Sequence, residues 1–312
     1  MRFVKSVLPL IVLVAGMMAV YLVTLSTDKE LVSLSFLLGF PFVAGGVMVA
    51  FRPKGAFKSF IGAMAWVVIV MIASLALSRI SGLEGFICIA MACVPILGAG
   101  LLGGVIAVTI QRVKADRKTT TGVYLLPLLA VWGLDQIPTE PQFYTISNTI
   151  EIAAPVGDVF DFIKEIRDIR PEEIDTRASH LLGVPKPTEA LWLVEEDGVT
   201  RHSYWGPKVH FLERITRIEQ DRRIEWRFEF PEGWAAEGIE DPHVKIGGKY
   251  VDVLSGGYLL EPLGEGRTRL VLTTRTRDSS GMGAYARFWH HFFIEDFHMV
   301  ILDLVKARLE TA

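Results

Sequence analysis

Three histidines and two adjacent carboxylates lie among aromatic residues near the end of the chain, in the run RFWHHFFIEDFHMVILDL. In a helix, His291, Glu295 and His298 share one face, because residues spaced i, i+4 and i+7 lie one above another. Glu295 and His298 also have the i, i+3 spacing of helical carboxylate–histidine metal pairs. The run therefore predicts a metal site, an acid–base site or the polar seam of a structural helix.

A zinc or iron site would need further ligands from outside this helix, because such sites use three or four. His202, His210 and His243 are the available histidines, but nothing in their spacing brings them together. The zinc-protease motif HExxH, the dithiol motif CxxC and the serine-hydrolase motif GxSxG do not occur in the sequence. We therefore predict neither a metal nor another cofactor.

A helical wheel of the same segment places an apolar stripe roughly opposite the histidines. The stripe consists of Trp289, Phe292, Phe293, Phe297, Val300 and Leu304. If it packs on a sheet, the His291–Glu295 face points away from the sheet, which favours a structural seam of i, i+4 pairs. His298 is kept as a candidate contact for a ligand head group.

Asp296 and Asp303 lie closer to the apolar stripe than the histidines do. A carboxylate that faces a packed sheet must be ion-paired or have a raised pKa. We expect either a buried ion pair with a strand arginine or a role in anchoring a ligand or in acid–base chemistry. The possible arginine partners are Arg217, Arg227, Arg269 and Arg275.

The composition divides the chain into two different halves. The 312 residues are 51% hydrophobic with a mean hydropathy of +0.37, which is too apolar for a single soluble globule. Basic residues outnumber acidic ones 11 to 5 through Gln136, whereas acidic residues outnumber basic ones 30 to 21 afterwards. An acidic second half excludes nucleic acid as a partner, because nucleic-acid binding needs a cationic surface.

The first half, residues 1–136, is predicted to be an α-helical transmembrane bundle. Crossing a hydrocarbon core takes roughly 20 apolar residues, and four charge-free stretches are long enough: 6–25, 31–51, 59–77 and 86–110. We interpret the first as an uncleaved anchor rather than a signal peptide, because three more spans follow. The stretch 119–134 is a marginal fifth span with Pro127 in its middle.

The charges between these spans predict a topology. Arg2 and Lys5, the basic loop between the second and third spans, and the basic run after the fourth lie on the cytoplasmic side by the positive-inside rule. If 119–134 crosses, as we expect, the second half lies on the outer face of the inner membrane; if it lies in the interface, the second half is cytoplasmic. Gly100 and Gly104 form a GxxxG pair that permits close helix packing and a homo-oligomer.

The second half, residues 137–312, is predicted to be an α+β domain. An alternating strand at 143–152 leads into a helix near Pro155, and a long helix at about 282–309 closes the chain. Between them lie six strand-like runs: ALWLVEE, TRHSYW, KVHFLERITRIE, RIEWRFEF, KYVDVLSGGYLLEPL and TRLVLTTRTR. A meander of that length must curl, and one long helix can fill its concave face. The faces of Phe211 and Glu213 stay unassigned.

The phrase TISNTIEIAAPVGDVFDFI resembles the opening strand and helix of the START-like, or SRPBCC, superfamily. The later strands and the closing helix are compatible with it, so the resemblance covers roughly residues 143–310. With the preceding spans, the chain looks like the membrane-anchored bacterial proteins of this superfamily that are labelled polyketide cyclase/dehydrase-like. The resemblance implies a helix-grip fold with a hydrophobic cavity, but no particular reaction.

Aromatic residues of the strands and the last helix could line such a cavity. The candidates are Trp205, Phe211, Trp226, Tyr258, Trp289 and Phe293. Three functions remain open: a membrane-anchored module that binds a lipid or another hydrophobic molecule, a cyclase or dehydratase with acid–base residues in the cavity, and a non-catalytic regulatory or scaffold protein. We favour the first.

Overall fold

The computed structural model of the protein describes residues 33–50, 59–82, 84–113, 126–127, 129–196, 198–236, 239 and 244–311. The chain divides into two compact units. One lies within Met1–Thr139, and the other is formed by Glu140–Glu240 and Val244–Ala312. We call them the helical unit and the grip unit.

The helical unit contains a short π-helix, η1 (Ser35–Gly39), that continues as α2 (Phe40–Ala50), followed by α3 (Phe60–Ile80) and α4 (Phe86–Val113). α3 and α4 coincide with the predicted spans 59–77 and 86–110, and both are long and apolar enough to cross a membrane by length and composition. Ser35–Ala50 is a shorter apolar helix within the predicted span 31–51. The predicted span 6–25 lies outside the described residues, and so does 119–125 of the marginal fifth span; residues 129–135 are helical.

Glycines bring α2 and α4 into backbone contact. A Cβ atom at Gly45 would lie 1.9 Å from the carbonyl oxygen of Gly100, and one at Gly103 would lie 1.8 Å from that of Phe42. Only residues without a side chain allow this approach. Gly104 faces α3, where an added Cβ would meet the Val67 side chain at 3.2 Å. The GxxxG pair thus packs helices of the same chain.

Replacing one of these glycines should loosen the helical unit. We expect Gly103→Leu to cost about 1–3 kcal/mol or more, because the new side chain would overlap the α2 backbone. Gly98→Leu is the control, since a Cβ there meets nothing within 4 Å. Thermal unfolding of the detergent-solubilised full chain, followed by circular dichroism, should show a loss of several degrees for Gly103→Leu alone. Equal melting of the two variants would contradict the packing.

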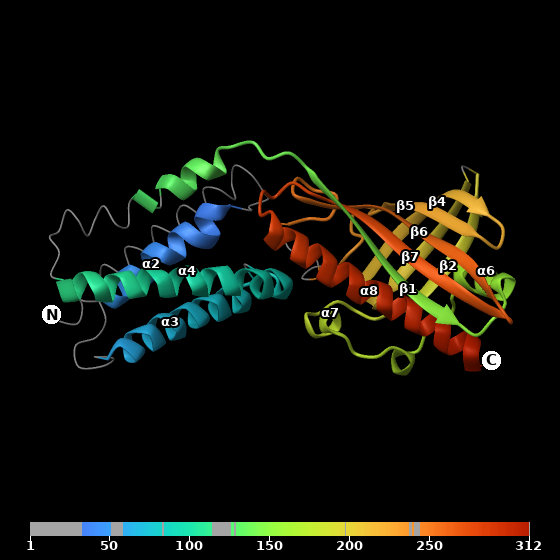
Figure 1. The fold of residues 1–312 in the computed structure, drawn as a ribbon, viewed down its shortest axis with the longest axis horizontal. Coiled ribbons are helices and arrows are strands. Elements are labelled where there is room, and N and C mark those ends of the chain that lie inside the picture. The colour runs from blue at the N-terminus through green and yellow to red at the C-terminus, as the bar shows by residue number, and fades with distance from the viewer. Residues whose placement is uncertain are drawn as a thin grey trace. The chain divides into compact units, whose positions relative to one another are not determined.

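The grip unit is a seven-stranded antiparallel sheet that curls against one long helix (Figure 1). Its strand order is β1-β7-β6-β5-β4-β3-β2, so the six consecutive strands form the predicted meander and β1 joins at its far edge. The strands are β1 (Gln142–Ile152), β2 (Pro187–Glu195), β3 (Gly198–Trp205), β4 (Val209–Glu219), β5 (Arg223–Glu229), β6 (Val251–Gly264) and β7 (Arg267–Asp278). The last helix, α8, spans Ala284–Thr311. The predicted helix-grip arrangement of sheet and closing helix is confirmed.

Alternation along the strands gives the sheet an inner face toward α8 and an outer face. On β7, Leu270, Leu272 and Thr274 are buried on the inner face, whereas Arg269 and Arg275 lie on the outer one. Directly paired residues of neighbouring strands share a face. The register therefore assigns each paired strand residue to one side of the sheet.

The hydrophobic core occupies one end of the space between the inner face and the helices. The short helix α6 (Val156–Lys164) contributes Val159, Phe160 and Ile163, each with essentially no exposed surface. Buried α8 residues in this core come from the C-terminal half of that helix: Val300, Leu302, Leu304 and Val305. The N-terminal half of α8, rich in aromatic residues, contributes no fully buried member to it.

Candidate functional site

A buried ion pair lies on the inner face of the sheet between β3 and β4. Arg201 and Glu213 are directly paired residues, and their exposed fractions are 3% and 5%. Arg201 Nε donates to Glu213 Oε2 at 2.5 Å, and a second guanidinium nitrogen also contacts that oxygen. Ser203 Oγ donates to the other carboxylate oxygen at 3.0 Å. Both oxygens of Glu213 are therefore occupied within the protein.

The rest of the Arg201 guanidinium is enclosed by backbone and aromatic rings. Its Nη1 donates to the carbonyl oxygen of Ile163 in α6 at 2.8 Å. Its central carbon lies 4.7 Å from the Trp226 ring centroid and 5.3 Å from that of Tyr258. A Cβ at Gly256 would come within 2.6 Å of the Trp226 ring, so the indole needs a glycine beneath it. Trp226 and Tyr258, predicted as ligand contacts, thus cover the ion pair and belong to the core.

Burial dominates the protonation equilibria of this cluster. It raises the pKa of Glu213, against the opposing effect of Arg201 and Ser203. It also raises the pKa of Tyr258, so the phenol is neutral at physiological pH. Because Glu213 accepts a hydrogen bond at each carboxylate oxygen and Arg201 is held by Glu213 and Ile163, the pair is a structural element of the sheet.

Histidine 298 lies on the inner face, contrary to the wheel prediction that placed it with His291 and Glu295 away from the sheet. Its exposed fraction is 3%, its Nε2 is 2.8 Å from Thr274 Oγ1, and its Nδ1 is 2.8 Å from Asn148 Oδ1. With the amide oxygen facing Nδ1, that nitrogen donates and Nε2 accepts from the threonine hydroxyl, as in a neutral imidazole. Burial lowers the pKa of His298 to about 4.

Asp296 and Asp303, in contrast, pair with the segment around α7 rather than with the sheet, and their predicted strand-arginine partners are wrong. Asp303 Oδ2 accepts from Arg177 at 2.6 Å, and Asp296 Oδ2 accepts from the backbone N–H of Ser179 at 2.9 Å. Both partners belong to the segment around the short helix α7 (Ala178–Leu181). Helix α8 is covered on two sides, by the sheet and by this segment, which a single apolar stripe does not reveal. His291 and Glu295 form a partly exposed contact at 3.4 Å, as a surface seam would.

The other predicted aromatic residues lie on the inner side but outside the buried core. Trp205 packs edge-on against Phe297 at 5.4 Å between ring centroids, and Phe293 connects Phe297 to Trp289. Phe211 on β4 contacts a second group, formed with Phe228, Phe230 and Trp234. Trp205, Phe211, Trp289, Phe293 and Phe297 are all only half-buried. We call these five residues, four from the first group and Phe211 from the second, the aromatic cluster.

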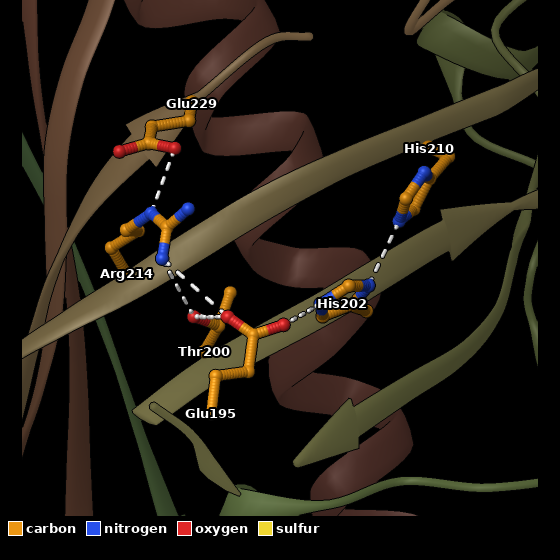
Figure 2. A network of polar contacts seen from close by, with 6 residues as sticks. All are labelled: Glu195, Thr200, His202, His210, Arg214 and Glu229. Carbon is orange, nitrogen blue, oxygen red and sulfur yellow. Dashed lines mark hydrogen bonds and ion pairs between the residues drawn. The ribbon is translucent and has the colours of Figure 1, made fainter. Parts of the chain in front are cut away.

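The outer face carries a polar network across β2, β3, β4 and β5 (Figure 2). His202 Nε2 lies 3.3 Å from Glu195 Oε1, and His202 Nδ1 lies 3.3 Å from His210 Nε2. Tyr204 stacks on His210 with 4.3 Å between ring centroids. Burial and the neighbouring His202 lower the pKa of His210.

His202 and His210, two of the three histidines considered as extra metal ligands, are thus neighbours, but they form no common ligand group with His291 or His298. Within the described ranges, no three His, Cys, Asp or Glu side chains are placed to hold a metal ion. His243 lies outside those ranges.

Sequence reasoning missed the Arg201–Glu213 pair. The only available signal was that Glu213 alternates in phase with Val209 and Phe211, so a carboxylate shares the face of apolar residues. That phase indicates a buried charge, but its partner is known only from the β3–β4 register.

Comparisons with known proteins give likenesses among solved structures alone. No family model matches the chain, and no curated protein matches it. An aromatase/cyclase from Streptomyces sp. R1128 is 17% identical, with 54% of this chain and 94% of that chain covered at a TM-score of 0.33. Norcoclaurine synthase of Thalictrum flavum is 12% identical (56% and 97% covered, TM-score 0.33), and Ara h 8.0201 is 11% identical (55% and 100%, TM-score 0.34). Since these TM-scores lie below 0.5, the fold description rests on strand order and register.

Removing the Glu213 charge should destabilise the protein strongly. We expect Glu213→Gln to cost about 3–5 kcal/mol, because it leaves the Arg201 charge buried without a counter-charge. Glu229→Gln is the control: Glu229 pairs with Arg214 on the exposed outer face, where such a pair contributes about 1 kcal/mol or less. Chemical unfolding followed by tryptophan fluorescence compares the two. Similar losses in both variants would refute the structural role of the buried pair.

His298 should make stability fall in mildly acidic solution. Its pKa of about 4 in the folded protein lies below the ordinary value of 6.5, so between these pH values the unfolded chain binds a proton that the folded chain does not. The free energy of unfolding therefore has its full value above about pH 6.5 and falls by about 1.4 kcal/mol per pH unit toward pH 4. His298→Gln should remove this one-proton contribution, whereas His291→Gln should not. Parallel pH profiles for wild type and His298→Gln would contradict the assignment.

Proposed function

We propose that the protein is a membrane-anchored binding protein whose grip unit holds a lipid or another hydrophobic small molecule beside the bilayer. The helical unit is the anchor and the aromatic cluster is the binding surface. The proposal keeps the grip unit on the outer side of the membrane, as the charge pattern of the loops favours.

The observation that carries this proposal is the division of α8 into two halves. Its C-terminal half is packed into the core, whereas its N-terminal half presents large rings that are only half-buried. These rings are not part of the core, and their exposed apolar surface costs roughly 25 cal/mol of free energy per Å² in contact with water. An apolar ligand would remove that area from solvent.

Buried polar atoms on the same side of the sheet support a ligand with a polar end. Among the described residues, Thr276 Oγ1 on the inner face and Trp289 Nε1 on α8 are buried without a hydrogen-bond partner. An unpaired buried donor costs about 1–3 kcal/mol. A carbonyl or hydroxyl group of a bound molecule could accept from such donors, and this would orient the molecule in the grip.

Exposed apolar side chains support the membrane anchor. Only 17% of the apolar window of α3 and 11% of that of α4 is buried within the protein, unlike the core helices of a soluble domain. The exposed apolar side chains of α3 include Ile61, Ile69, Ile72 and Leu77. Lipid would cover them.

A cyclase or dehydratase activity is less well supported than binding. Acid–base chemistry would need an ionisable group with a free position on the inner face. Glu213 has both oxygens occupied, and His298 has both ring nitrogens occupied. We therefore assign no catalytic residue.

The proposal predicts a hydrophobic molecule that co-purifies with the full chain. Phe297→Ala removes a ring of the aromatic cluster, and losing about 1.5–3 kcal/mol of apolar burial should weaken retention roughly tenfold or more. Phe288→Ala on the same helix is the matched control, because Phe288 is 56% exposed. Mass spectrometry of organic extracts of detergent-purified protein measures the bound molecule. Absence of any stoichiometric hydrophobic molecule, or recovery of the chain without detergent, would refute the proposal.

A further inference from the structure

A row of polar residues crosses the outer face of the sheet on five neighbouring strands. The register pairs Arg214 with Arg227, Arg227 with Ser255, Ser255 with Arg275, and Arg275 with Thr145. The row lies on the outer face because Arg227 follows the buried Trp226, and Arg275 lies between the buried Thr274 and Thr276. Ser255 therefore has an arginine on each side.

The centre of this row is hollowed. Arg227, Leu254, Ser255 and Arg275 line a depression of about 370 Å³, a volume at the lower end of the range for small-molecule sites. The pairing register shifts between Val253 and Ser255, so Leu254 is an extra residue in β6. Such a bulge bends a strand locally and re-aims its side chains.

Among the described residues, the two arginines that flank the hollow differ from other arginines of the strands in having no carboxylate partner. Arg214 is paired with Glu229, Arg223 with Glu225, and Arg269 with Glu151 and Glu261, while Arg277 lies 3.9 Å from Asp252. Within the part of the chain that the structure describes, neither Arg227 nor Arg275 forms an ion pair. The nearby carboxylates are thus already held by other arginines, and two positive charges remain at one hollow.

The strand spacing places the two charges near one another, and an aromatic contact restrains one of them. Neighbouring strands lie about 4.8 Å apart, so the two arginine backbones are separated by roughly 10 Å, with Ser255 between them. The Arg275 guanidinium lies over the Phe143 ring at 4.9 Å, which restricts its motion. Two guanidinium forks and a hydroxyl match the several acceptor oxygens and the negative charge of a phosphate group.

We propose that the Arg227–Ser255–Arg275 hollow is a binding site for a phosphate group. The group belongs either to a phospholipid head group or to a soluble phosphate compound, and both would be held by the same two guanidinium groups. The site is on the opposite face of the sheet from the aromatic cluster, so it stands independently of the hydrophobic ligand proposed above.

Calorimetric titration of the full chain in a non-ionic detergent tests the site. The probes are inorganic phosphate and a short-chain phosphatidic acid, with a short-chain diacylglycerol as the uncharged comparison. We expect the phosphate-bearing probes to bind, and Arg227→Gln and Arg275→Gln each to weaken binding at least tenfold. Arg269→Gln on the same face of β7 is the matched control, because its charge is already paired, and should leave affinity within twofold.

The outcomes separate the two sources of phosphate. Tighter binding of phosphatidic acid than of inorganic phosphate identifies a lipid head group, whereas equal affinities identify a soluble phosphate compound. The proposal is overturned if wild type binds neither probe at millimolar concentration, if diacylglycerol binds as well as phosphatidic acid, or if the Arg227 and Arg275 variants bind like Arg269→Gln. Unchanged melting temperatures of the arginine variants exclude unfolding as the cause, and retention of the co-purified hydrophobic molecule should be the same in all of them.

Discussion

The buried pair of Arg201 and Glu213 is the constraint on which the grip unit depends. Two charges removed from water cost several kcal/mol each unless every donor and acceptor is matched. Here the carboxylate is shared by Arg201 and Ser203, and the guanidinium also bonds the end of α6. A shift of β3 by one residue would turn Arg201 to the outer face and leave the Glu213 charge unpaired in the core. The pair therefore ties the β3–β4 register to the position of α6, and Trp226 must lie over Gly256 to cover it.

In the function proposed above, this arrangement separates stability from recognition along α8. The C-terminal half of the helix, with α6 and the sheet, forms a continuous core that closes over the ion pair. His298 marks the transition between the halves, because it is a polar residue held by Thr274 and Asn148 within otherwise apolar packing. Beyond it, the rings of the aromatic cluster contribute little to the core. Such a division lets a rigid frame carry a surface that is free to accept an apolar molecule.

The two faces of the sheet have different chemistry for the same geometric reason. Because side chains alternate, each strand offers one row to the core and another to solvent. The outer rows are rich in arginine and glutamate that neutralise one another in cross-strand pairs, with the polar network of Figure 2 as one example. Arg227 and Arg275 depart from this pattern at a hollow, which is why the outer face as well as the inner face is a candidate for binding.

Local periodicity in the sequence determined the elements: the apolar stretches that became α3 and α4, the six-strand meander, the preceding strand and the long last helix. These follow from interactions within a few residues, so alternation and run length suffice to predict them. Only the tertiary structure decided which charges meet. Arg201 pairs with Glu213 and Asp303 with Arg177, whereas Arg227 has no carboxylate partner among the residues that the structure describes. Strand register and the segment that covers α8 decide these contacts, because they join residues far apart in the chain. The prediction placed His298 on the wrong face for the same reason. A helix covered on two sides buries more than one stripe, and a helical wheel does not show which elements pack against the helix.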